Sequence, residues 1–256
     1  MSAATRIVLF ARSAIYFAFL VVTVIPYAVA VLLWSWIPNP RRYWLATGWP
    51  TLAIWGARVI CGIDVHVEGL QNLPDGPAIL LPKHQSAWET LWFVKAMPRP
   101  LSYVYKRELH YLPFFGWGLA SLGMINIDRK RGSDAFEQVV EQGARHLAQG
   151  DYVLIFPEGT RTAPGAITRY KTGGARLAVR TGAPAVPVAI NSGEVWPRRS
   201  FLKTPGTITV SIGPPIEPAG RTPEDMALAV EGWIETEMRR IAPHRYRGPW
   251  SPNGAR

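Results

Sequence analysis

The pattern of hydrophobic and polar residues divides the chain into two parts near residue 61. Residues 13–36 contain no charged side chain. As a helix they would be about 36 Å long, enough to cross the hydrocarbon core of a bilayer, which is about 30 Å thick. A second, weaker apolar stretch covers residues 43–61. From Gly62 onward, short apolar runs alternate with amphipathic segments, which is typical of a folded domain.

Residues 1–61 are therefore predicted to form membrane-associated helices that either span the bilayer or lie in its interface. We expect Pro26 to kink the first helix. Five tryptophans in this region suit the headgroup layer: Trp34, Trp36, Trp44, Trp49 and Trp55. Arginines flank both ends of the first segment, so the positive-inside rule selects no orientation. A cleaved signal peptide is the alternative, but the apolar run continues to residue 36, beyond the small residues at 28–30 that resemble a cleavage site.

Residues 62–256 are predicted to form an α/β domain. Strands are expected at residues 63–67, 78–81, 101–104, 123–127, 152–156, 185–190 and 207–212. Helices are expected from near Ser86 and at residues 133–149, 173–181 and 222–241. Strands that alternate with helices imply a mostly parallel sheet covered by helices. Ligands of such sheets bind beyond the carboxyl ends of the strands, in the loops that follow.

Composition narrows the classes of partner. The formal net charge is +10, which favours an anionic partner such as an anionic lipid or a phosphorylated substrate. Nucleic acid is disfavoured, because the chain has no zinc-finger spacing and no long basic block. The single cysteine, Cys61, excludes an intrachain disulfide. The five histidines lack the spacing with acids or cysteine that a metal site needs, so we expect no metal and no cofactor.

The stretch LPKHQSAWETLW, residues 81–92, allows two interpretations. Ser86 and Glu89 match a capping box, the ordinary start of a helix. His84 and Glu89 could instead be a general base and the carboxylate that fixes its tautomer. A helix that begins at Ser86 leaves His84 outside it, so the two interpretations are compatible in geometry. They compete for one carboxylate, which is expected to hold the Ser86 amide or the imidazole, but not both well.

Cations follow several predicted strands. The sequence FPEGTR, residues 156–161, comes after the most apolar strand; its Gly159 permits a tight turn, and Arg161 offers a two-pronged donor for phosphate. Arg129 and Lys106 also follow strands, and Lys171 precedes a helix whose amides could help to hold an anion. Each alone is most often a solvated charge. Together, beside a candidate base, they favour an anion-binding site.

These residues resemble the lysophosphatidic acid acyltransferase family (1-acylglycerol-3-phosphate O-acyltransferases). The motifs of that family appear in order over roughly residues 65–215 as His84…Glu89, Gly123…Arg129, Phe-Pro-Glu-Gly-Thr-Arg at 156–161, and Val-Pro-Val at 186–188. The block at 156–161 is the specific signal. This chain has Glu89 where the family has aspartate.

The resemblance implies an α/β acyltransferase domain preceded by membrane-associated helices. It implies that His84 takes the proton from the free hydroxyl of lysophosphatidic acid as that oxygen attacks an acyl thioester, that Glu89 orients His84, and that no covalent intermediate forms. The residues implied in binding the phosphate are Arg161, Arg129 and Lys106, together with Glu158, Gly159, Thr160 and Lys171, with Glu158 ordering the loop.

The implied product is phosphatidic acid, for phospholipid synthesis. The implied partners are a thioester donor (acyl carrier protein or coenzyme A), a lysophospholipid acceptor and a membrane. The implied location is the inner or cytoplasmic membrane, with the catalytic domain facing the cytoplasm. Three alternatives remain: a related enzyme with another lysolipid acceptor, a serine hydrolase, and a non-catalytic basic membrane-binding module. The hydrolase is disfavoured because the chain lacks a G-x-S-x-G motif.

Overall fold

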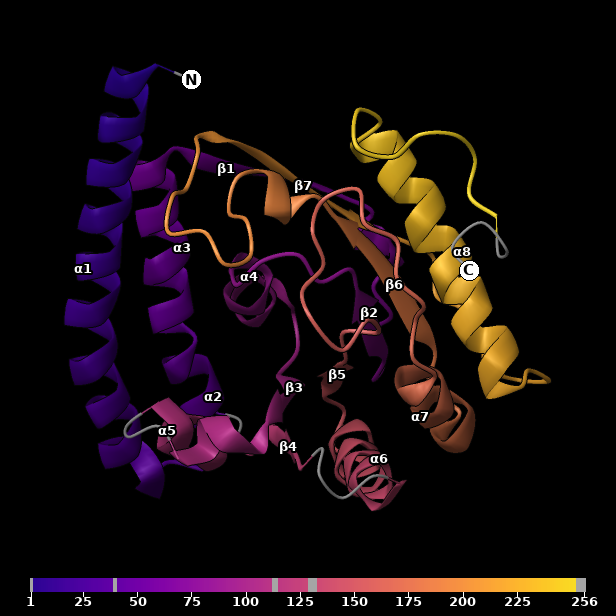
Figure 1. Ribbon diagram of the computed structural model, residues 1–256. Coiled ribbons are helices and arrows are strands. Elements are labelled where there is room, and N and C mark those ends of the chain that lie inside the picture. The colour runs from indigo at the N-terminus through magenta and orange to yellow at the C-terminus, as the bar shows by residue number, and fades with distance from the viewer. Residues whose placement is uncertain (1, 39–40, 112–114, 129–132, 252–256) are drawn as a thin grey trace.

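The computed structural model describes residues 2–38, 41–111, 115–128 and 133–251 (Figure 1). The N-terminal part consists of the helices α1 (Ala3–Leu33), α2 (Arg41–Ala46) and α3 (Gly48–Cys61). Helix α1 begins earlier than its uncharged segment predicts, because the Ser2 side chain caps it by accepting a hydrogen bond from the Thr5 amide. The helix then continues through Pro26 to its end.

Helices α1 and α3 lie side by side (Figure 1). The Tyr16 hydroxyl of α1 donates to the Ala53 carbonyl of α3 at 3.0 Å. Gly56 permits the close approach, since a Cβ at this position would lie 2.6 Å from the Phe19 ring. Among the described residues, α1 is the helix long and apolar enough to cross a membrane. Many of its large apolar side chains face away from the protein: Ile7, Val8, Phe10, Ile15, Phe17, Val21, Val22 and Ile25.

The described residues form a seven-stranded sheet in the order β1-β7-β6-β2-β5-β3-β4. The strands are β1 (Ile63–Glu68), β2 (Ile79–Pro82), β3 (Leu101–Lys106), β4 (Ile125–Ile127), β5 (Tyr152–Leu154), β6 (Ala185–Ile190) and β7 (Gly206–Ile212). All neighbouring pairs are parallel except β6 with β7, so β1 and β7 run against the other five strands. The predicted mostly parallel sheet is confirmed, with each predicted strand present.

Helices cover both faces of the sheet (Figure 1). The helices are α4 (Trp88–Ala96), α5 (Phe115–Ser121), α6 (Ser133–Ala148), α7 (Gly173–Thr181) and α8 (Pro223–Ile241). Short 3₁₀ segments lie at Trp34–Trp36, Leu70–Asn72, Arg107–Tyr111 and Ser192–Glu194. Thr222 caps α8 through a capping box with Asp225, and Pro223 occupies the first turn. Helix α5 was not predicted, because its sequence FGWGLAS has two glycines and no clear apolar period.

The central strand β2 shows how the core is divided. Successive side chains of a strand point to opposite faces. Ile79 and Leu81 accordingly pack in the core beneath α6, α7 and α8, whereas Leu80 packs beneath α1, α3 and α4. Continued past the end of β2, this alternation sends neighbouring side chains to opposite sides of the sheet edge. Lys83 and His84, the second and third residues after Leu81, stand in that relation.

Replacing Leu80 by alanine should lower the free energy of unfolding by about 2–5 kcal/mol, because the fully buried side chain would leave a cavity. The matched control is Leu70→Ala, since Leu70 is 51% exposed and its loss opens no cavity. Chemical denaturation of the detergent-solubilised proteins, followed by circular dichroism, measures both. Equal stabilities of the two variants would contradict the central place of β2 in the core.

Candidate active site

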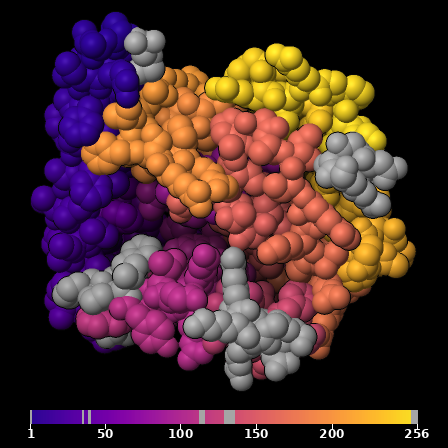
Figure 2. Space-filling model, in the orientation of Figure 1, coloured from indigo at the N-terminus to yellow at the C-terminus, as the bar shows by residue number. Residues whose placement is uncertain are grey.

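The candidate residues gather at the carboxyl edge of the parallel strands, where ligands of such sheets bind. His84 follows β2, Lys106 ends β3, the FPEGTR segment follows β5, and Ser192 follows β6. Figure 2 shows a hollow on one face of the molecule between the loop around residues 192–205, the segment that follows β5 and the segment that follows β3. The sheet topology therefore brings together segments that are far apart in the sequence.

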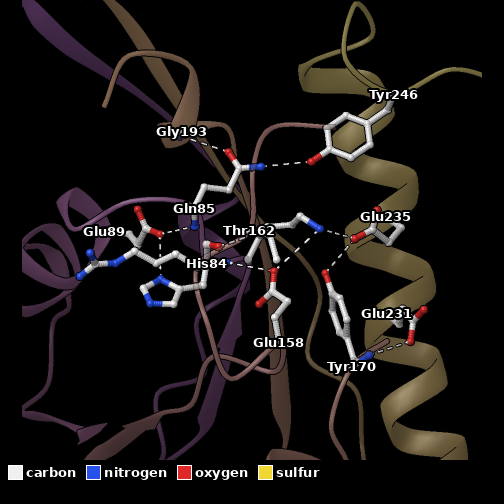
Figure 3. Close-up of polar contacts among 12 residues, drawn as sticks. His84, Gln85, Glu89, Glu158, Thr162, Tyr170, Gly193, Glu231, Glu235 and Tyr246 are labelled. Atoms are coloured by element: carbon white, nitrogen blue, oxygen red, sulfur yellow. Dashed lines mark hydrogen bonds and ion pairs between the residues drawn. The ribbon is translucent and has the colours of Figure 1, made fainter. Parts of the chain in front are cut away.

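The Glu89 carboxylate, buried at the first turn of α4, holds the loop that carries His84 (Figure 3). Its Oε1 lies 3.0 Å from His84 Nδ1 and accepts hydrogen bonds from the amides of Gln85 at 2.6 Å and Ser86 at 2.7 Å. Its Oε2 accepts from the Ser192 hydroxyl at 2.6 Å. One carboxylate thus contacts both the Ser86 amide and the imidazole, where the sequence led us to expect a choice between them.

The helix itself begins slightly later than the capping box implies. Helix α4 starts at Trp88, and Ala87 occupies the cap position. The Ser86 hydroxyl still accepts a hydrogen bond, from the Trp88 amide at 3.1 Å. The two loop amides of Gln85 and Ser86 therefore point their N–H groups toward Glu89, while the first amide of the helix points toward Ser86. The positive end of the helix also favours a carboxylate at this position.

The His84 imidazole is held on two sides and open on a third. The ring stacks on Phe156, with 3.7 Å between centroids and 15° between planes. Its Nδ1 faces Glu89, which favours the tautomer with the proton on Nδ1. Within the described part of the chain, Nε2 has no hydrogen-bond partner, and the side chain is 12% exposed. This arrangement leaves the Nε2 lone pair available to accept a proton.

The turn at residues 157–160 is tied to the His84 loop. Gly159 has a φ of 68°, a conformation that side chains disfavour. A Cβ there would also lie 2.8 Å from the Lys171 ammonium, so Lys171 rests against the turn. Thr162 donates to the His84 carbonyl through its amide at 2.7 Å and its hydroxyl at 3.1 Å. Movement of either loop would therefore strain the other.

A buried ionic cluster lies on the α8 side of this edge (Figure 3). Lys83 Nζ is 2.5 Å from Glu235 Oε1 and 3.8 Å from Glu158 Oε1, and all three side chains are fully buried. Burial raises the pKa of Glu158 to about 7, although Lys83 and the His84 amide favour its ionised form. Burial alone would lower the pKa of Lys83, but the two carboxylates outweigh it and hold that pKa above its usual value.

Glu158 belongs to this buried cluster, whereas the sequence analysis grouped it with the residues expected to bind phosphate. Its carboxylate accepts a hydrogen bond from the His84 amide at 3.1 Å and is shielded from solvent. Because the side chain is fully buried, a phosphate outside the cluster does not reach this carboxylate. What the structure supports is the other role expected of Glu158, the ordering of its loop.

Lys83 and Glu235 were not singled out by the sequence, because they lie 152 positions apart and a lysine or glutamate usually lies at the surface. Gln85, the neighbour of His84, was also missed. Its side chain donates to the Tyr246 hydroxyl at 3.1 Å and accepts from the Gly193 amide at 3.1 Å. For Lys83 and Gln85, the one available signal in the sequence was their position on either side of His84 in a strand-to-helix loop.

The predicted phosphate ligands have separate places. Arg161 is exposed, and Arg198 donates to its carbonyl. Lys106 is exposed at the end of β3, and Thr160 lies in the turn after β5. Arg129 lies outside the described residues.

A polar pocket of about 420 Å³ adjoins the end of β3 and is lined by Arg107, His110, Tyr111, Asn126, Asp128 and Gln138. Within the described ranges, no group of three or more histidine, cysteine or acidic residues is placed to hold a metal ion. The pocket is large enough for a polar headgroup, and cations flank it in the sequence at Lys106 and Arg129.

Comparison with known proteins identifies the family. The family model described as Acyltransferase matches residues 64–191. The 1-acyl-sn-glycerol-3-phosphate acyltransferase of Pseudomonas aeruginosa is 44% identical over 215 residues, which cover 82% of this chain and 83% of that protein. The human 1-acyl-sn-glycerol-3-phosphate acyltransferase alpha is 33% identical over 175 residues, which cover 67% of this chain and 62% of that protein.

A solved structure confirms the fold. The crystal structure of the 1-acyl-sn-glycerophosphate (LPA) acyltransferase PlsC from Thermotoga maritima aligns with 98% of this chain and all of that one, with a TM-score of 0.76 and 23% sequence identity. The sheet, its covering helices and the N-terminal helices therefore form an architecture already seen in a solved protein. On the matched domain and the bacterial relative together, the chain belongs to the lysophosphatidic acid acyltransferase (1-acylglycerol-3-phosphate O-acyltransferase) family.

Proposed function

We propose that this protein transfers a fatty acyl group from an acyl thioester to the free hydroxyl of lysophosphatidic acid, giving phosphatidic acid for phospholipid synthesis. The observation that carries the proposal is the His84–Glu89 pair, with Nδ1 engaged and Nε2 open at the carboxyl edge of the sheet. The similarity to enzymes named for this reaction supports the choice of acceptor.

The pair suits general base catalysis. His84 Nε2 takes the proton of the acceptor hydroxyl as that oxygen attacks the thioester carbonyl carbon. Glu89 stabilises the imidazolium that forms, and the Phe156 ring keeps the imidazole in its plane. When the tetrahedral intermediate collapses, the C–S bond breaks, and the imidazolium returns its proton to the departing thiolate. No side chain of the enzyme bonds to the acyl group in this sequence of steps.

The candidate cations suit the acceptor phosphate. We assign phosphate binding to Arg161, Arg129 and Lys106, supported by Gly159 and Thr160 of the turn before Arg161 and by Lys171, which packs against that turn. Arg161 and Lys106 are exposed, so a phosphate can reach both side chains from solvent. A guanidinium binds phosphate through two parallel hydrogen bonds, which also fixes its orientation.

A membrane location agrees with the exposed apolar side chains of α1. We propose that residues 1–61 associate with the inner or cytoplasmic membrane and that residues 62–256 act from its cytoplasmic side. The acceptor can then keep its acyl chain in the bilayer while its phosphate reaches the basic edge of the sheet. The donor is an acyl thioester of acyl carrier protein or of coenzyme A.

The direct test of the function is to incubate the membrane-embedded protein with lysophosphatidic acid and a labelled acyl thioester. Labelled phosphatidic acid is the expected product. Label released only as free fatty acid would instead indicate a hydrolase. If no thioester is turned over, the non-catalytic membrane-binding module becomes the favoured alternative.

His84→Ala should lower the rate of acyl transfer by at least about 10²-fold, since general base catalysis typically contributes about 10²–10⁴-fold. His66→Ala is the matched control, because His66 is an exposed residue of β1 and should retain activity near the wild-type level. Initial rates, with folding checked by circular dichroism, measure both variants. A folded His84→Ala protein that keeps most of the activity would remove the base assignment.

Arg161→Ala should raise KM for lysophosphatidic acid by about 10-fold or more, because a hydrogen bond between charged groups is worth about 1.5–3 kcal/mol. It should change KM for monoacylglycerol, which lacks the phosphate, much less. Arg221→Ala, in the exposed loop before α8, is the control and should alter neither value. Equal effects of Arg161→Ala on both acceptors would show that Arg161 does not bind the phosphate.

A further inference from the structure

Lys83 is adjacent to His84, yet its ammonium contacts Glu235 of α8, whereas the His84 imidazole contacts Glu89 of α4. The alternation along β2 directs the Lys83 side chain toward α8, where its ammonium is fully buried. Glu235 Oε1 lies 2.5 Å from Nζ, and the rings of Tyr170 and Tyr246 lie above it at 5.6 and 5.8 Å. A buried charge is costly, and the reaction described above uses none of these groups directly.

The connection to His84 passes through a single oxygen atom. Glu158 Oε1 is 3.8 Å from Lys83 Nζ and accepts the His84 amide at 3.1 Å. The other oxygen, Oε2, is buried and accepts no hydrogen bond from the described residues. The position of the Glu158 carboxylate therefore depends on the Lys83 ammonium and on the amide that it holds.

Glu235 completes the connection from the far end. Its Oε1 accepts hydrogen bonds from Lys83 and from the Tyr170 hydroxyl at 3.0 Å. Arg239, one turn later on α8, lies 3.7 Å from its Oε2. The C-terminal helix thus fixes the lysine, the lysine fixes Glu158, and Glu158 fixes the backbone from which the imidazole extends.

We propose that Lys83 is a positioning residue for acyl transfer, which couples Glu235 of α8 through Glu158 to the His84 backbone and so makes the C-terminal helix part of the catalytic support. The inference rests on the proposed function. It concerns how the base is held, and it adds no group that touches the substrate.

The charges around Glu158 set the sign of the expected pH effects. Lys83 favours the ionised carboxylate and Glu235 opposes it, while Glu231, Arg239, Tyr170 and Tyr246 surround the cluster from α8 and the neighbouring loops. Removing the ammonium should raise the pKa of Glu158 from its value of about 7, and neutralising Glu235 should lower it. A protonated Glu158 loses its charge and holds the His84 amide less firmly.

The test compares Lys83→Met with Glu235→Gln. Lys83→Met should lower kcat at neutral pH by about 10- to 100-fold, as expected for a displaced catalytic group, with KM for both substrates changed less than about threefold. The acid limb of its kcat profile should move to higher pH. In Glu235→Gln the acid limb should move to lower pH. The exposed matched controls, Lys95→Met on α4 and Glu224→Gln on α8, should move neither limb.

Movement of the acid limb in opposite directions in the two variants would support the proposal, since a fold that is merely weakened loses activity without such a pattern. Limbs that stay in place, or that move in the same direction, would overturn it. If Lys83→Met does not fold, the direction found for Glu235→Gln decides alone. Wild-type protein without His84-dependent transfer would overturn both the function and this inference, whereas normal wild-type transfer with unmoved limbs overturns the inference only.

Discussion

The site is organised around one buried carboxylate, that of Glu89, which requires hydrogen-bond donors from the protein. Glu89 has no exposure to solvent, and an ionised carboxylate is stable there only if hydrogen bonds replace its water. Two loop amides, the Ser192 hydroxyl and the His84 imidazole meet that need. Because those donors come from the loop after β2 and the segment after β6, satisfying the charge also fixes the two loops against α4. The geometry of the His84–Glu89 pair is thus a consequence of the solvation of one carboxylate.

A pair of carboxylates holds the opposite side of the same loop. Glu158 and Glu235 enclose the Lys83 ammonium, and the alternation of β2 separates this cluster from the imidazole. The loop is consequently held from both faces of the sheet, by α4 on one and by α8 on the other. Arg161 lies outside this buried frame, with its side chain exposed to solvent.

Much of the architecture could be predicted, because apolar periodicity reports directly which faces are buried. The strands and the helices α6, α7 and α8 follow from such patterns. Glu89 was found by its short separation from His84, but its ability to hold the Ser86 amide and the imidazole together depends on a turn that no pattern encodes. Lys83 and Glu235 could not be found, since the contact between them is set by how β2 and α8 pack. Helix α5 lacks a periodic signal.

The N-terminal helices also share their core with the sheet. Tyr16 packs in the same cluster as Leu80, and the buried Ser13 hydroxyl of α1 accepts a hydrogen bond from the Lys203 amide. Helix α1 is therefore packed firmly against the α/β domain and is not merely joined to it by a flexible linker. Deleting it to obtain a detergent-free enzyme would expose that core, and any tilt of the helix in a bilayer would turn the whole catalytic edge with it.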